Sequence, residues 1–131
     1  MRLLLDTHVW LWMSESPERI AQSVLVALDS QETECILSAA VAYEISLKVA
    51  LGKLTLPAPA RDWLRERAEL LQAQPLAISL EHAWTAASLP MHHRDPFDRL
   101  LVAQAMVEGV TLVTADRALE PYGVSLLWAA R

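Results

Sequence analysis

The chain has 131 residues and a formal net charge of −5, and 53% of its residues are hydrophobic. This length predicts one domain over residues 1–131, because single cores usually hold about 100–200 residues, and the composition excludes a disordered chain. No apolar stretch approaches the roughly 20 residues of a membrane span, and no secretory leader is evident, so we expect a soluble cytoplasmic protein. The acidic balance argues against broad nonspecific nucleic-acid binding, although bound divalent cations would reverse the charge locally.

The first half of the chain alternates strand-like and helix-like segments. The pair Ser16-Pro17 is typical of a helix cap followed by a first-turn proline, and an alanine-rich stretch closed by Gly52 predicts a further helix. The elements expected here are a strand over Arg2–Asp6, a short helix over Thr7–Met13, a helix from Pro17 through Ile20, Val24 and Leu28, a strand over Glu34–Ser38 and a helix over Ala39–Leu51.

The second half continues the alternation. Pro57 and Pro59 mark a loop, and Asp95-Pro96 starts a helix that Gly109 ends. The elements expected here are a helix over Arg61–Ala73, a strand over Leu76–Leu80, helices over Glu81–Leu89 and Phe97–Glu108, a strand over Val110–Thr114 and a fifth strand over Ser125–Trp128. This order predicts the α/β class, with a central parallel sheet of four or five strands and helices on both faces. Ligands in such folds gather beyond the carboxyl ends of the strands.

Four acidic residues fall at this edge of the expected sheet. Asp6 ends the first strand, Glu44 lies in the helix after the second, Asp98 begins the helix before the fourth, and Asp116 follows the fourth. Carboxylates held close together repel one another, and they stay ionised at neutral pH only when water separates them or cations bridge them. The pattern therefore favours an all-oxygen site for Mg²⁺ or Mn²⁺.

Each aspartate also has a local explanation. Asp6 and Asp116 each precede a helical segment and are candidate N-caps. Asp95 suits the cap of the helix that starts at Pro96, where Asp98 is a first-turn acid favoured by the helix dipole. Taken singly, none of these residues indicates a catalytic site. The prediction depends on the coincidence of the acids at one edge of one sheet.

Glu44 has a local explanation too, since Lys48 stands four residues later in the orientation of a solvated helical ion pair. We expect structural or solvent-facing roles for the four histidines, because His92 and His93 are adjacent and side chains at adjacent positions rarely converge. A single cysteine, Cys35, allows no intrachain disulfide and is expected in the core. Core positions are also expected for Trp63, Trp84 and Trp128, whereas Trp10 and Trp12 cannot both face the same core.

Four segments resemble the motif blocks of the PIN-domain family, and more narrowly its VapC-type toxin ribonucleases. They are LLLDTH at the start, SAAVAYEISLKVALGKL in the middle, HHRDPFDRLLVAQA later and LVTAD near the end. The blocks occur in the family's order and extend from residue 3 to residue 116. Together they form a far more specific signal than any one of them alone.

The resemblance implies an endoribonuclease whose acidic residues are Asp6, Glu44, Asp98 and Asp116, with Asp95 as a further acid that binds metal through water or only caps its helix. One or two Mg²⁺ or Mn²⁺ ions would activate water for attack on the phosphate, leaving a 5′-phosphate and a 3′-hydroxyl. The resemblance also implies a small antitoxin protein as partner, with its tail in a groove near the acids, and a homodimer.

Further polar residues match positions near the acids in that family. The hydroxyls of Thr7, Ser38 and Thr114 would orient a carboxylate or a water, and Thr7 and Thr114 are also candidate substrate contacts. The alternative for Ser38 is strand-end hydrogen bonding to backbone. Lys48 and Arg99 are candidate contacts to substrate phosphate, with surface charge pairs as the alternative.

Other classes remain as alternatives. A phosphoacceptor receiver domain has a similar length and clustered acids but requires a lysine after its last strand, and the lysines here are Lys48 and Lys53. Haloacid-dehalogenase-like phosphatases begin with Asp-x-Asp. The corresponding segment here is Asp6-Thr7-His8, with a histidine in place of the second aspartate. An inactive binding module with the same fold is the third alternative. A histidine-based ribonuclease would need no metal, so sensitivity to EDTA distinguishes it from a metal-dependent ribonuclease.

Overall fold

A computed structural model describes residues 1–131 and contains one five-stranded sheet in the order β3-β2-β1-β4-β5. Every pair of neighbouring strands is parallel. The strands are β1 (Arg2–Leu5), β2 (Glu34–Ser38), β3 (Gln74–Leu76), β4 (Thr111–Thr114) and β5 (Leu126–Trp128). The predicted parallel α/β architecture is therefore confirmed.

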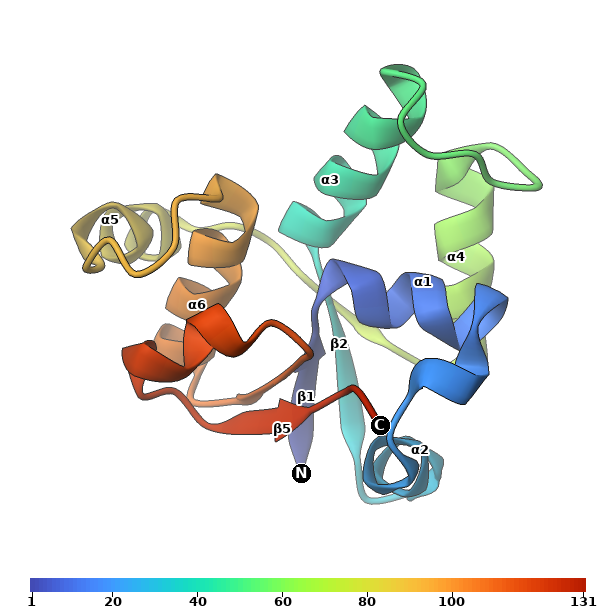
Figure 1. Ribbon diagram of the computed structural model, residues 1–131, viewed down its shortest axis with the longest axis horizontal. Coiled ribbons are helices and arrows are strands. Elements are labelled where there is room, and N and C mark those ends of the chain that lie inside the picture. Colours follow the sequence, from blue (N-terminus) through green and yellow to red (C-terminus); the bar gives the residue numbers. More distant parts are fainter.

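Helices connect successive strands and lie on both sides of the sheet, with α5 and α6 at the left of Figure 1 and α1, α2 and α4 at the right. No helix combines the length and apolar character needed to cross a membrane. The helices are α1 (Thr7–Glu15), α2 (Gln22–Asp29), α3 (Ala39–Ala50), α4 (Ala60–Leu70), α5 (Leu80–Ser88) and α6 (Pro96–Glu108), with short 3₁₀ turns over Pro17–Arg19 and Arg117–Tyr122.

The central strand explains the leucine run near the start of the chain. A parallel strand covered by helices on both faces buries every side chain, so consecutive apolar residues replace the alternation of a half-exposed strand. Leu3, Leu4 and Leu5 of β1 are fully buried, and Trp10 of α1 packs into the same core. Cys35 of β2 is buried as predicted, and burial raises the pKa of its thiol to about 12, so the thiolate form is scarce at neutral pH.

The single helix predicted from Pro17 through Leu28 is wrong. The chain leaves the 3₁₀ turn at Ile20, whose extended backbone forms an isolated antiparallel bridge with Ala130. The next residue, Ala21, donates its N–H to the carbonyl of Ala129 over 2.7 Å, and α2 starts only after it. Pairing with the distant C-terminal segment satisfies backbone groups that a continuous helix would have used, and this explains the break.

The third strand was predicted over Leu76–Leu80, but it spans Gln74–Leu76. Its register pairs Leu76 with Ser38, the last residue of β2. Beyond that point β2 turns into α3, so the residues after Leu76 have no neighbouring strand to pair with. Ser79 instead caps α5 by accepting a hydrogen bond from the His82 N–H.

The carboxyl ends of the three central strands meet at one edge of the sheet. Asp6 directly follows β1, and its N–H donates to the carbonyl of Val113 in β4 over 3.0 Å. Ser38 ends β2 and Thr114 ends β4. In Figure 1, α3 starts where β2 ends, at the upper end of the strands. The candidate residues singled out in the sequence are thus brought to this edge.

Candidate active site

Asp6 is the most deeply placed of the acids, with 2% of its surface exposed. Its Oδ1 accepts the N–H of Thr7 over 2.7 Å, which makes it the N-cap of α1, and its Oδ2 accepts the hydroxyl of Thr114 over 2.7 Å. Burial raises the pKa of Asp6 even though the neighbouring His8 and these hydrogen bonds favour its charged form. The cap prediction is confirmed, and the same carboxylate lies in the acidic cluster.

Glu44 joins the cluster from the second turn of α3. Its Oε1 accepts the hydroxyl of Thr7 over 2.6 Å, and its Oε2 forms a 2.8 Å ion pair with Lys48. The expected helical ion pair therefore exists. The side chain of Glu44 is buried, however, so it does not belong to a solvated helix face as the local spacing suggested.

The hydroxyls of Thr7 and Thr114 serve to hold carboxylates. Both residues are buried, and Thr7 links Glu44 to the segment that carries Asp6. Thr114 donates to Asp6 and accepts the N–H of Asp116 over 3.0 Å, so one hydroxyl connects two members of the acidic set. This geometry matches the carboxylate-orienting role expected for these residues, and it leaves neither hydroxyl free for a substrate.

Asp98 lies close enough to the other acids for their charges to act on its carboxyl group. Burial, together with the negative charges of Asp6, Asp95, Glu44 and Asp116, raises the pKa of Asp98 to about 8. A carboxyl group crowded by like charges holds its proton more tightly, because deprotonation would add another negative charge to the same small volume. The metal-free protein therefore keeps a proton on Asp98 at neutral pH.

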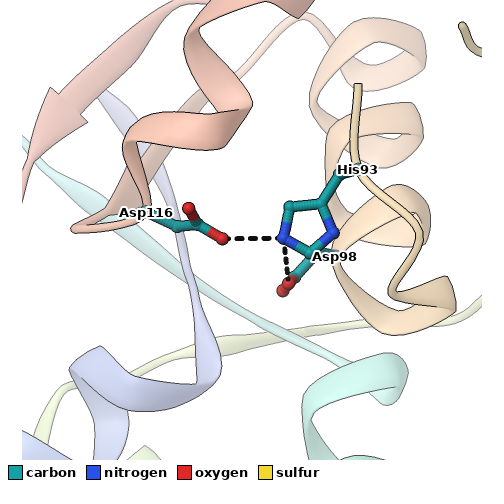
Figure 2. A group of neighbouring side chains, drawn as sticks. All are labelled: His93, Asp98 and Asp116. Atoms are coloured by element: carbon teal, nitrogen blue, oxygen red, sulfur yellow. Dashed lines mark hydrogen bonds and ion pairs between the residues drawn. The ribbon is translucent and has the colours of Figure 1, made fainter. Parts of the chain in front are cut away.

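Asp116 reaches the cluster from the loop after β4 and meets His93 there. The Nε2 atom of His93 lies 2.8 Å from Asp116 Oδ2 and 3.2 Å from Asp98 Oδ2, as Figure 2 shows. Ligand atoms of these three residues all lie within 4.8 Å of one another. Asp116 also caps the following 3₁₀ turn by accepting the N–H of Ala118, as predicted.

The protonation state of His93 follows from its second ring nitrogen. Nδ1 accepts the backbone N–H of Asp95 over 3.0 Å, so the proton of the neutral ring sits on Nε2. His93 therefore donates a hydrogen bond to Asp116 and lies beside Asp98, and its Nε2 offers no lone pair to a metal in this arrangement. The structural role predicted for the histidines extends in this case to the acidic cluster, which the sequence did not indicate. The only sequence signal was its position two residues before a helix cap.

Asp95 and Ser38 act as caps. Asp95 Oδ1 accepts the N–H groups of Phe97 and Asp98 at the start of α6. Ser38 accepts the N–H of Ala40 at the start of α3 and donates its hydroxyl to Gln104, so its strand-end alternative is the observed one. Both residues fix the starts of the helices that carry Glu44 and Asp98.

Arg99 was predicted as a phosphate contact, and the structure contradicts this. The side chain is 7% exposed and donates to main-chain carbonyls around the turn between α5 and α6. A guanidinium surrounded by carbonyl oxygens is compensated locally and cannot reach a substrate on the surface. Its acceptors are the carbonyl oxygens of Ala86 (2.8 Å), Leu89 (2.8 Å), Pro90 (3.0 Å) and His93 (3.1 Å).

The adjacent residues His92 and His93 do not converge on one site, as their positions in the sequence predicted. His92 packs edge-on against Tyr122, while His93 faces the acids.

The tryptophans expected in the core differ in burial. Trp63 is buried as predicted, and Trp128 is half-buried beneath Arg117. Trp84 is 62% exposed, so the core prediction is wrong for it. It lies on α5, which packs against α6 through its opposite face, as the burial of His82 and Ala86 shows.

The donor set fits a hard divalent cation. Asp6, Glu44, Asp98 and Asp116 offer oxygen atoms only, and Asp98 is crowded by the negative charges of the other acids in a largely buried position. Lys48 pairs with Glu44 at one side of the cluster, and His93 serves as a neutral donor at the other. Mg²⁺ and Mn²⁺ prefer carboxylate oxygen, so the residues present suit either ion.

The fold and this cluster define an α/β protein with a carboxylate-rich site at the carboxyl edge of its sheet. The model of the PIN domain family matches residues 3–124. This chain belongs to the PIN-domain family. The match confirms the family that the four motif segments predicted, and it leaves the receiver-domain and phosphatase alternatives without support.

Similar proteins agree with this assignment. Ribonuclease VapC22 from Mycobacterium tuberculosis is 32% identical over 121 residues, which cover 92% of this chain and 91% of that protein. VapBC2 from Rickettsia felis, solved bound to a promoter DNA fragment, superposes with a TM-score of 0.71 at 14% identity, covering 98% and 99% of the two chains. VapBC-5 from Mycobacterium tuberculosis, a member of the VapBC family of toxin-antitoxin systems, has a TM-score of 0.60 at 16% identity over 99% and 98%.

Proposed function

We propose that this protein is the toxin of a toxin-antitoxin pair, a divalent-metal-dependent endoribonuclease that inhibits growth by cleaving RNA in the cytoplasm. The observation that carries this proposal is the convergence of Asp6, Glu44, Asp98 and Asp116 from four distant segments. The similarity to Ribonuclease VapC22 over nearly the whole chain supports the reaction class. The cleavage experiment below distinguishes this function from the alternative of an inactive binding module with the same fold.

In this proposal Asp6 and Asp98 ligate the cation directly, and Glu44 and Asp116 complete the set as ligands or as holders of bound water. The cation, when bound, supplies Lewis-acid stabilisation of phosphate charge and activation of water. Thr7 and Thr114 keep the carboxylates oriented, and Lys48 balances part of the charge of Glu44. Asp95 contributes by capping α6, so that Asp98 is presented at a fixed position.

The direct test compares the wild-type protein with Asp6→Asn on structured RNA in Mg²⁺ or Mn²⁺. Asparagine keeps the shape and the N-cap acceptor of Asp6 but removes its charge, so we expect at least about a 100-fold loss of cleavage rate. EDTA should abolish wild-type cleavage. Equal cleavage by both proteins would identify a contaminating nuclease and contradict the proposal. Growth arrest upon expression, relieved by the same substitution, would assign the toxin role.

Metal binding should depend on pH because Asp98 must lose its proton to become a ligand. With the pKa of Asp98 at about 8 in the metal-free protein, Mn²⁺ affinity should rise by up to about tenfold per pH unit below that value and then level off. Calorimetry in two buffers of different ionisation enthalpy should register close to one proton released per ion at pH 6. An affinity that stays constant between pH 6 and pH 8 would contradict this coupling.

The partners proposed are a small antitoxin and a second copy of this chain. The antitoxin is supported by the similarity to VapBC systems. The exposed Leu80 and Trp84, one turn apart on α5, support a protein interface, because large apolar side chains in a patch commonly mark one. Light scattering of the purified toxin, with Trp84→Ser as the variant, tests whether this helix carries the homodimer contact.

A further inference from the structure

A groove of about 410 Å³ lies beside the acidic cluster, between the second half of α3 and the start of α6. Figure 1 shows the far end of α3 and the start of α6 at the same end of the molecule. Glu44 belongs both to the cluster and to the groove wall, so the two features are continuous. The other lining residues are Leu47, Lys48, Leu51, Lys53, Arg94, Asp95, Pro96 and Phe97.

Two cations on this groove are free of partners within the protein. Lys53 comes from the turn after α3 and Arg94 from the loop before α6, and both are exposed. Neither forms a salt bridge or stacks on an aromatic ring. Their charge is therefore available to an external anion, in a protein whose net charge is −5.

Most of the other cations have partners within the protein. Arg2, Lys48 and Arg67 are in salt bridges, and Arg19 and Arg117 lie over tryptophan rings. Arg99 and Arg131 donate to main-chain carbonyls. Of the eleven lysines and arginines, four remain without such a partner. Lys53 and Arg94 line this groove, and the other two, Arg61 and Arg65, line a second groove along α4.

The groove also has an aromatic side. Phe97 lines it, and Tyr43 packs edge-on against Phe97 with ring centroids 5.6 Å apart. Tyr43 is 61% exposed, so its ring is open to a stacking partner. Proteins that bind single-stranded nucleic acid combine such rings with cations that follow the backbone. An acidic peptide would use the cations but would leave the aromatic pair without a planar partner.

We propose that this groove binds the RNA strand next to the bond that is cleaved, with Lys53 and Arg94 contacting backbone phosphates and the Tyr43–Phe97 pair stacking a base. The inference rests on the proposed ribonuclease function and adds the path of the substrate. The strand in this groove is unpaired, because a base must be free of its pairing partner to stack on protein rings. Lys48, predicted as a phosphate contact, also lines this groove, as Glu44 and Lys53 do.

The test measures binding separately from cleavage. In an Asp98→Asn background, which keeps a labelled RNA intact, fluorescence anisotropy with a mixed-sequence single-stranded RNA gives the affinity over a series of salt concentrations. Each phosphate contact on a single strand contributes about 0.7 to the slope of log affinity against log salt. The double variant Lys53→Gln/Arg94→Gln should therefore lower that slope by about 1.4 and weaken binding by at least tenfold near 0.1 M salt.

Two variants make this result specific. Arg61→Gln/Arg65→Gln on α4 removes the same charge from cations that are equally unpaired, and it should leave RNA affinity within about twofold. Tyr43→Ser should weaken binding roughly fivefold or more without changing the salt slope, because stacking carries no charge. In the wild-type background, Lys53→Gln/Arg94→Gln should raise KM for RNA cleavage and leave kcat unchanged, as expected for loss of uniform binding.

Several outcomes would overturn the inference. Equal losses in the α4 control would show a general charge effect. Cleavage by the wild-type protein together with unchanged binding and KM in Lys53→Gln/Arg94→Gln would remove the groove from the substrate path and leave the ribonuclease function standing. Unchanged RNA binding with lost binding of a polyglutamate peptide would assign the groove to an acidic protein segment. A wild-type protein that neither binds nor cleaves RNA would reject the function and this inference with it.

Discussion

Asp98→Asn is expected to abolish RNA cleavage while making the metal-free protein more stable. The loss of cleavage, at least about 100-fold, follows from the loss of a charged metal ligand. The gain in stability follows from the crowding of Asp98 by Asp6, Asp95, Glu44 and Asp116 within a buried site. Asparagine removes that repulsion, and its carbonyl oxygen can still lie beside the N–H of His93.

The pH dependence of this gain has a definite sign. The pKa of Asp98 is about 8 in the folded protein and about 4 in an unfolded chain, so the folded state binds the proton more tightly. The contribution of this group to stability is therefore complete below pH 4 and is lost as the pH rises toward 8. At pH 8 we expect Asp98→Asn to exceed the wild type by roughly 2–4 kcal/mol in free energy of unfolding, and at pH 4 the two should agree.

Denaturant unfolding at pH 4, 6 and 8 in EDTA measures this difference. The matched control is Asp29→Asn, which removes a charge from an exposed position at the end of α2. That change should alter stability by no more than about 0.5 kcal/mol at any of these pH values. Saturating Mn²⁺ should reverse the order of stability, because only the wild type gains the full free energy of metal binding. A wild type that is as stable as Asp98→Asn at pH 8 without metal would contradict the crowded cluster.

Arg99→Met is expected to lower the stability of the folded protein strongly. Four main-chain carbonyls, those of Ala86, Leu89, Pro90 and His93, lose their shared donor in a buried environment. Pro90 keeps the hydroxyl of Tyr122 as a donor and Ala86 keeps the N–H of Leu89, whereas the carbonyls of Leu89 and His93 lose the arginine donor. A buried polar group left without a partner costs about 1–3 kcal/mol when water cannot reach it. Partial relaxation of the turn reduces the sum, so we expect a loss of about 3–5 kcal/mol.

Guanidinium chloride unfolding of Arg99→Met, Arg99→Lys and Arg2→Met checks this expectation. Lysine keeps the charge but has fewer donors in a different geometry, so Arg99→Lys should recover only part of the loss. Arg2 pairs with Glu34 in a half-exposed salt bridge, and its replacement should cost at most about 1 kcal/mol. Arg99 also holds the carbonyl of His93, so weaker Mn²⁺ binding should accompany the destabilisation. A cost for Arg99→Met close to that for Arg2→Met would contradict the role assigned to this side chain.

The sequence was sufficient where the signal is local. Consecutive leucines predicted the buried strand that is observed at Arg2–Leu5, and Asp95-Pro96 with Gly109 located both ends of α6. Gly109 has a φ of 65°, a left-handed conformation that costs glycine little, which is why a glycine so often ends a helix. These features depend on a few neighbouring residues and on backbone sterics. The same kind of signal located the ends of β2 and β4, and thus the edge at which the acids lie.

Only the tertiary structure decided which side chains meet. The break at Ile20 comes from pairing with Ala130, and the burial of Arg99 comes from carbonyls that α5 presents to it. Tertiary contacts also place His93 in the acidic cluster and bury Glu44, which the local spacing had placed on a solvated helix face. Each depends on partners far away in the chain, brought near by packing of the helices on the sheet. The sequence alone determined most of the elements and the acidic edge. The free energy of burying a polar group depends on all of its neighbours at once, and it decided which side chains are in contact.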